Sequence, residues 1–191
     1  MATQVLPTLP DEIVSKIIEL CAEESVYNLA GWLRAGKRGY ALAHERSVLK
    51  TCDVSEMVLY VTCQIREGGK FRALHLKCVD AGNTRAIYHE GLLKAPTSEG
   101  LHASIKILEP NIPNHDMSTL AVGIFNVCLG KEKEADLNIN KYEDTFKFPD
   151  DLIIKTPRCL YGHDYRRENI YGGSCPNCRL FWLCVNISQI L

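Results

Sequence analysis

A chain of 191 residues has room for one domain or two small ones. Hydrophobic residues make up 46% of the chain and charged residues 24%, as in ordinary folded proteins. The formal net charge of -1 predicts no electrostatic surface for nucleic acid or for an anionic membrane, and no apolar run reaches the roughly 20 residues that span a bilayer.

The start of the chain has neither the basic residues nor the apolar stretch of a secretory signal. We therefore expect a cytoplasmic or nuclear location, or both. In such a location the nine cysteines are better interpreted as reduced thiols or metal ligands than as disulfides.

Residues 9 to 50 show the pattern of three short helices. Pro10 cannot lie inside a helix, whereas Asp11 and Glu12 suit a first turn, so we expect the first helix to begin at about residue 11. Ser25 would cap the second helix, which ends near Gly36. The helices have more apolar face than they can bury on one another, which predicts a partner or a neighbouring domain. The apolar positions are Ile13, Ile17 and Leu20, then Val26, Leu29, Ala30 and Leu33, then Tyr40, Leu42, Ala43, Val48 and Leu49.

The residue order in this region resembles an F-box, assigned to residues 7–50. The matching motifs are Leu9-Pro10-x-Glu12-Ile13-Val14-x-x-Ile17, Ser25-Val26-x-x-Leu29-x-x-x-Leu33 and Lys37-x-x-Tyr40-x-x-Ala43. The resemblance implies a non-enzymatic receptor that docks a Skp-family linker protein and, through it, a cullin of a ubiquitin ligase. It also implies that the linker-facing residues include Leu9, Pro10, Ile13, Ile17, Val26, Leu29 and Leu33.

Two glycines depart from the F-box pattern in the third helix. Gly36 and Gly39 are poor helix formers, each costing about 1 kcal/mol in a helix interior. The alternative for this region is an N-terminal helical hairpin that packs on the rest of its own chain.

Two helical hairpins are expected after a connecting helix at residues 51–66 and a break at residues 67–70. In the first, the helices meet at Gly82-Asn83. In the second, they meet at Asn114-His115, and Pro110 and Pro113 shorten its first helix. The turns are 32 residues apart, which is typical of tetratricopeptide-type repeats, here assigned to residues 67–135.

The combination of the two regions resembles a group of plant F-box proteins with a tetratricopeptide-like or Sel-type repeat domain. The repeat motif runs Phe71-x6-Cys78-x3-Gly82-Asn83-x2-Ala86-x-Tyr88-x2-Gly91-Leu92, with Gly123-Ile124-x3-Cys128-x-Gly130 in the second copy. The resemblance implies a mainly all-α fold in which the repeats recruit a target protein.

The C-terminal part changes character. We interpret the charged residues 131–134 as a turn and residues 136–158 as a polar connector. The tail, residues 159–191, contains Cys159, His163, Cys175 and Cys178, in which Cys175-Pro176-Asn177-Cys178 has the spacing of zinc ligands. A Cys3His set would be closed and structural, with Cys184 as an alternative ligand. The competing interpretation is a small apolar hairpin with inert buried cysteines.

The chain has no phosphate-binding glycine loop, nucleophile elbow or zinc-protease motif, so we expect no enzyme activity. The sequence thus favours a substrate receptor of a Skp-cullin-F-box ligase. The alternative is a helical-repeat scaffold with an F-box-like cap that does not bind the linker.

Overall fold

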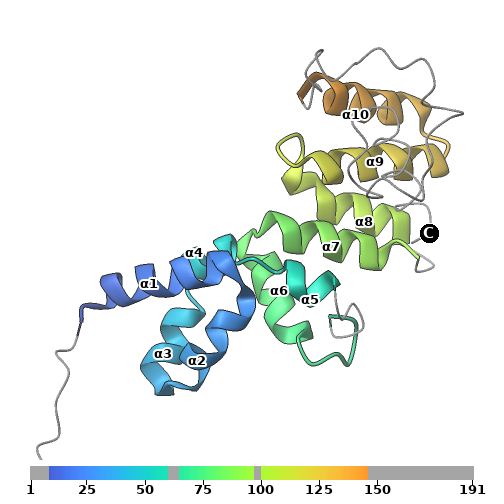
Figure 1. Ribbon diagram of the computed structural model, residues 1–191. Helices are drawn as coiled ribbons and strands as arrows, with labels where there is room; N and C mark the ends of the chain where they lie inside the picture. Colours follow the sequence, from blue (N-terminus) through green and yellow to red (C-terminus); the bar gives the residue numbers. More distant parts are fainter. Residues whose placement is uncertain (1–8, 60–64, 97–99, 146–191) are drawn as a thin grey trace, which may run out of the picture. The chain divides into compact units, whose positions relative to one another are not determined.

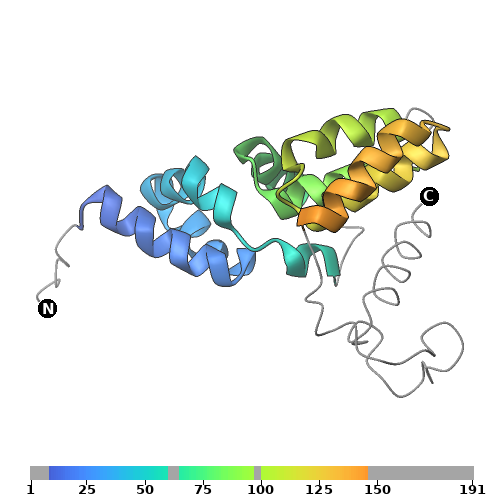
Figure 2. The ribbon, with the colours of Figure 1, turned by 90° about the horizontal axis from the view of Figure 1, so that it is seen from above.

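The structure, a computed structural model, describes residues 9–59, 65–96 and 100–145 (Figures 1 and 2). These residues form helices joined by short turns, with no strand among them, which confirms the predicted mainly all-α fold. The chain divides into two compact units, residues 1–89 and 90–191. Among the described helices, none is both long enough and apolar enough to cross a membrane.

The first unit begins with α1 (Asp11–Glu24), which starts directly after Pro10, as expected. The hydroxyl of Ser25 accepts the N–H of Tyr27 at 3.2 Å, so Ser25 caps the 3-10 turn η1 (Val26–Asn28). Helix α2 (Leu29–Arg34) continues from η1. The second expected helix therefore consists of a 3-10 turn followed by an α-helix.

The region expected to hold one third helix holds two, α3 (Gly36–Ala43) and α4 (Arg46–Thr51). Gly36 has φ +91°, which an L side chain rarely adopts, and it allows the chain to reverse between α2 and α3. A Cβ at Gly39 would lie 2.7 Å from the carbonyl oxygen of Trp32 on α2. The two glycines that depart from the F-box pattern are therefore the residues that permit the tight turn and the close approach of α2 and α3.

The core of the first unit lies among α1, α3, α4 and α6 (Arg72–Ala81). Helix α1 packs on α3 and α4, and α4 packs on α6; Figure 1 labels these helices. The side chains buried there come from every helix of the unit and are mostly small or branched, which suits short helices in close contact. They include Ile18, Ala22, Val26, Leu29, Leu42, Ala43, Val48, Leu49, Cys52, Val54, Met57, Cys78 and Ala81.

The structure corrects the prediction of a connecting helix over residues 51–66. Among the described residues of this stretch, α5 covers Ser55–Leu59, and Cys52, Asp53 and Val54 before it are not helical. The backbone of Asp53 is used elsewhere, because its N–H donates to the carbonyl of Ala22 at 2.8 Å and its carbonyl accepts the N–H of Val26 at 2.9 Å. These bonds fasten the end of α1 to the segment after α4.

The helices α6 and α7 (Thr84–Lys94) meet at Gly82-Asn83, as predicted. Gly82 has φ +88° and ends α6 with a left-handed residue. We expected a domain boundary at residues 67–70, but the division into units falls within α7, after His89. Since α6 packs on α4, the first predicted repeat shares its core with the F-box-like region.

The second unit contains the end of α7, then α8 (Gly100–Leu108), the 3-10 turn η3 (Glu109–Asn111) and α9 (Asp116–Cys128). Pro110 lies in η3, directly after α8, so the early end of this helix agrees with the prediction. His115 caps α9, because its Nδ1 accepts the N–H of Ser118 at 3.2 Å.

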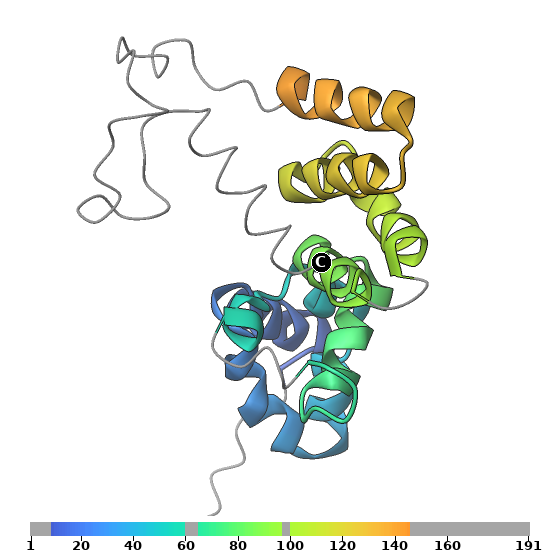
Figure 3. The same ribbon diagram turned by 90° about the vertical axis from the view of Figure 1, so that its right-hand side faces the viewer.

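A further helix, α10 (Glu132–Thr145), replaces the expected charged turn and the first part of the expected polar connector. Helices α9 and α10 lie side by side (Figures 1 and 3). Ala135 and Asn138 are buried, and a Cβ at Gly123 would lie 3.0 Å from Cγ1 of Ile139. Ala135 and Ile139 thus lie four residues apart on one face of α10, next to the buried Asn138, whereas Leu137 is exposed.

Candidate functional site

The largest run of exposed apolar side chains in the described parts of the chain follows α1. Leu9 is 46% exposed, Ile13 51%, Ile17 39% and Leu20 52%. Ile13, Ile17 and Leu20 align along one side of the helix at spacings of four and three residues. Leu9 lies just before the helix, and we call these four residues the α1 stripe. The other side of α1 is buried, with Ile18 and Ala22 fully covered by the rest of the first unit. Helix α1 is therefore apolar on two sides, of which only one is used within its own unit.

Contacts at both ends hold α1 in place. At the N-terminal end, Arg38 of α3 forms an ion pair with Asp11 at 2.6 Å and donates to the carbonyl of Leu9. In the middle, the hydroxyl of Ser15 donates to Glu45, which lies between α3 and α4. At the C-terminal end, Ala22 bonds to Asp53, as described above. The α1 stripe is thus presented on a helix that is already ordered.

The seven residues that the F-box resemblance implies as linker-facing fall into three groups. Leu9, Pro10, Ile13 and Ile17 are exposed along α1. Val26 and Leu29 are 3% and 0% exposed, so they belong to the core. Leu33 is half-buried on α2. Leu20 joins the exposed group, although it was not among the seven; its spacing of three from Ile17 was the signal for it.

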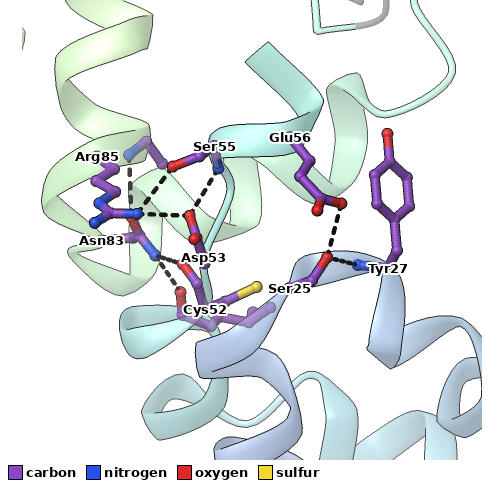
Figure 4. A network of polar contacts seen from close by, with 10 residues as sticks. Ser25, Tyr27, Cys52, Asp53, Ser55, Glu56, Asn83 and Arg85 are labelled. Carbon is purple, nitrogen blue, oxygen red and sulfur yellow. Dashed lines mark hydrogen bonds and ion pairs between the residues drawn. The ribbon is translucent and has the colours of Figure 1, made fainter. Parts of the chain in front are cut away.

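A second group of polar contacts joins the segment after α4 to the start of α7 (Figure 4). Asn83 is 3% exposed, and its Nδ2 donates to the carbonyls of Leu49 at 3.0 Å and Cys52 at 2.7 Å. Its Oδ1 accepts the N–H of Ala86 at 3.0 Å, which is an N-cap bond for α7. One buried side chain therefore satisfies three backbone groups from two segments.

Beside Asn83, Arg85 binds Asp53 at 2.7 Å and the hydroxyl of Ser55 at 2.9 Å. The N–H of Ser55 also donates to the Asp53 carboxylate at 2.9 Å. Burial by itself raises the pKa of Asp53, but the hydrogen bonds from Ser55 and Arg85 and the charge of Arg85 outweigh it and hold that pKa below its ordinary value. The Asp53 carboxylate is thus stabilised in its charged form.

Two thiols lie near this network. Cys52 and Cys78 are both buried, and each side chain affects the pKa of the other. The interaction with Cys52 lowers the pKa of Cys78, whereas the interaction with Cys78 and then burial raise the pKa of Cys52. Proton loss from the pair is therefore favoured at Cys78.

The predicted zinc ligands Cys159, His163, Cys175 and Cys178, and the alternative Cys184, lie outside the described residues. Within the described ranges, no group of three or more His, Cys, Asp or Glu side chains could hold a metal ion. The site that the geometry offers is therefore the α1 stripe. Comparison with protein-family models, with curated proteins and with solved structures found no match to this chain.

Proposed function

We propose that the chain is a non-catalytic substrate receptor of a Skp-cullin-F-box ubiquitin ligase. The α1 stripe docks the Skp-family linker, which connects the chain to a cullin. The helices after residue 67, together with the tail, bind a target protein. Catalysis belongs to the recruited conjugating enzyme, and this chain contributes proximity between target and enzyme.

The observation that carries the proposal is the exposure of the α1 stripe on a helix whose other side is buried. An isolated exposed leucine is ordinary on a protein surface, but three aligned apolar side chains on one ordered helix, with a fourth just before it, are typical of an interaction surface. The residue order that resembles an F-box covers the same helix. The proposal thus rests on the sequence pattern and on the surface, which are separate observations.

The strength of docking can be bounded from the exposure. Fully burying a Leu or Ile side chain contributes about 1.5–3 kcal/mol, so four side chains that are about half exposed contribute about 3–6 kcal/mol on docking. On its own this corresponds to weak binding, in the millimolar range or somewhat tighter. A stable complex therefore needs further contacts from α2 and α3, where Leu33 is half-buried and Tyr40 is 50% exposed.

Val26 and Leu29 have a different role in the proposal from the one that the resemblance implies. As core residues, they support α1 from inside the first unit. Their replacement by alanine would weaken linker binding only by destabilising the fold, at a cost of about 1–5 kcal/mol each. Stability measurements on these variants separate this indirect effect from direct contact.

The test is linker binding by an Ile13→Glu/Ile17→Glu variant. Both positions are exposed, so the fold should survive, while two carboxylates facing an apolar groove should weaken binding at least 100-fold. The matched control is Val127→Glu/Leu137→Glu in the second unit, where the side chains are 56% and 55% exposed. Equally tight linker binding by wild type, Ile13→Glu/Ile17→Glu and Val127→Glu/Leu137→Glu would overturn the docking role of the α1 stripe. A folded wild-type chain without linker binding would instead leave a helical-repeat scaffold.

We further propose that the tail holds one structural zinc ion through Cys159, His163, Cys175 and Cys178, with Cys184 as the alternative ligand. The supporting observation is the Cys-x-x-Cys spacing at Cys175 and Cys178, which lets two thiolates reach one ion.

A further inference from the structure

Cys52 and Cys78 are brought together by the fold, although they are 26 positions apart in the sequence. Cys52 ends α4, and Cys78 lies in α6, which packs on α4. Cys52 is 1% exposed and Cys78 is 0% exposed, and each thiol shifts the pKa of the other. A disulfide between them requires the two sulfur atoms to approach to about 2.05 Å.

Asn83 holds the backbones of both cysteines independently of the sulfur contact. Its side-chain Nδ2 donates to the carbonyl of Cys52 at 2.7 Å, and its own N–H donates to the carbonyl of Cys78 at 3.0 Å. One buried residue is therefore bonded to the backbones of both cysteines, and Figure 4 shows its bond to Cys52. These bonds keep the backbones at Cys52 and Cys78 connected through Asn83 as long as the first unit is folded.

We propose that Cys52 and Cys78 form a reversible disulfide when the folded protein meets a hydroperoxide. The disulfide would link the end of α4 to α6 and act as a redox-controlled clamp on the first unit. This inference does not depend on the proposed function, since it concerns the α4–α6 contact and not the α1 stripe.

The reaction balances with hydrogen peroxide as oxidant. The Cys78 thiolate attacks one peroxide oxygen, the O–O bond breaks, and the products are a sulfenic acid and, after protonation, one water. The Cys52 sulfur then attacks the Cys78 sulfur, forming the S–S bond and releasing the second water. Two thiols lose two electrons and two protons in total, and the peroxide is reduced to two waters.

The burial of both thiols determines how fast we expect peroxide to oxidise them. Peroxide reaches the pair only when the α4–α6 contact opens locally, so oxidation of the pair should be slower than that of the exposed Cys128. Once formed, the cross-link constrains the unfolded chain and should raise Tm by on the order of 10 °C. A dithiol reductant should reverse the shift.

The experiment is disulfide mapping of the full chain after hydrogen peroxide treatment, with free thiols blocked by alkylation. Trypsin should release residues 51–66 joined to residues 78–85. Since the first peptide also contains Cys63, the mapping is repeated in a Cys63→Ala variant. Cys52→Ala removes the proposed bond, and Cys128→Ala is the control for an exposed thiol.

The expected result is the joined peptide in wild type, Cys63→Ala and Cys128→Ala, its absence in Cys52→Ala, and a reversible rise in Tm. Free, alkylated Cys52 and Cys78 in treated wild-type protein would overturn the proposal. A link that is lost in Cys63→Ala would also overturn it, because Cys63 would then be the partner of Cys78. These two contradicting results come from wild type and Cys63→Ala, which both keep Cys52 and Cys78. A folding defect of Cys52→Ala therefore does not decide the outcome.

Discussion

The buried hydrogen bonds of Asn83 lead to a specific prediction about the stability of the first unit. Replacing it by alanine removes its donations to the carbonyls of Leu49 and Cys52 and its N-cap acceptance from Ala86. The Asn83 side chain is buried, so water can replace these three bonds only if this part of the first unit opens locally. The substitution is small and sits outside the α1 stripe, so it tests the fold without touching the proposed docking surface.

The magnitude follows from the number of bonds. A buried hydrogen bond contributes about 0.5–1.5 kcal/mol net, and the N-cap share alone is about 1 kcal/mol. Three bonds together predict a loss of about 2–4 kcal/mol in the free energy of unfolding. In urea this corresponds to a lower midpoint by about 1–2 M.

Urea unfolding can be followed by the fluorescence of Trp32, which lies in the first unit. The only other tryptophan, Trp182, should be replaced by phenylalanine in every protein compared. Asn114→Ala, in an exposed turn of the second unit, is the matched control and should change stability by no more than about 0.5 kcal/mol.

Asn83→Asp tests the two donor bonds of the Asn83 side chain separately from its acceptor bond. The carboxylate can still accept the N–H of Ala86, but it faces the carbonyl oxygens of Leu49 and Cys52 with no donor. At neutral pH it should destabilise the first unit at least as much as alanine does. Alanine and aspartate variants as stable as wild type would refute the importance given to this residue.

Three further predictions concern other parts of the chain. Gly39→Ala should lower the free energy of unfolding by about 1–3 kcal/mol in thermal or urea unfolding, because its Cβ would lie 2.7 Å from the Trp32 carbonyl oxygen. This loss is expected although alanine favours helices. Gly31→Ala is the control and should not lower stability, because the space around a Cβ at Gly31 is open. Folding lowers the pKa of Asp53, so the charged carboxylate stabilises the fold fully above its unfolded-state pKa of about 4, and this stabilisation is lost as the pH falls through its folded-state pKa. The difference in unfolding free energy between wild type and Asp53→Asn should therefore shrink below about pH 4, which unfolding measurements at several pH values would test. Purified protein should carry about one zinc per chain by elemental analysis, and Cys175→Ser/Cys178→Ser should lose it; a metal-free chain with an unchanged melting profile would contradict this prediction.

The helices of the first 50 residues were largely predictable, because their start signals are local. Pro10 and the acidic residues after it mark the first turn of α1, and Ser25 marks a cap, so the sequence alone located both. The division into α3 and α4 at His44 and Glu45 was missed. The close approach at Gly39 had no signal in the sequence, because it depends on the position of α2.

The errors in the later part of the chain have the same physical origin. Helix α10 is polar overall, and its buried face becomes visible only against α9, where Gly123 admits Ile139. The helix expected over residues 51–66 fails because the backbone of Asp53 bonds to α1 and η1 instead. Helix periodicity indicates which residues are able to face a partner, but not which partner is present.

The candidate site was predictable only in part. The spacing of Ile13 and Ile17 indicated one helix face, but not whether this face lies toward the core or the solvent. The structure leaves it exposed, while Val26 and Leu29 are in the core. The two donor bonds of Asn83 and the pairing of Cys52 with Cys78 had no signal in the sequence, because they join segments that are far apart in the chain.

The most direct test of the proposed function is calorimetric titration of the folded chain with a purified Skp-family linker at several temperatures. The account predicts saturable one-to-one binding with a negative heat-capacity change, because the α1 stripe leaves water on docking. It also predicts that Ile13→Glu/Ile17→Glu abolishes the heat of binding while Val127→Glu/Leu137→Glu preserves it. No binding by a well-folded wild-type chain would contradict the account and remove the connection to ubiquitin ligases.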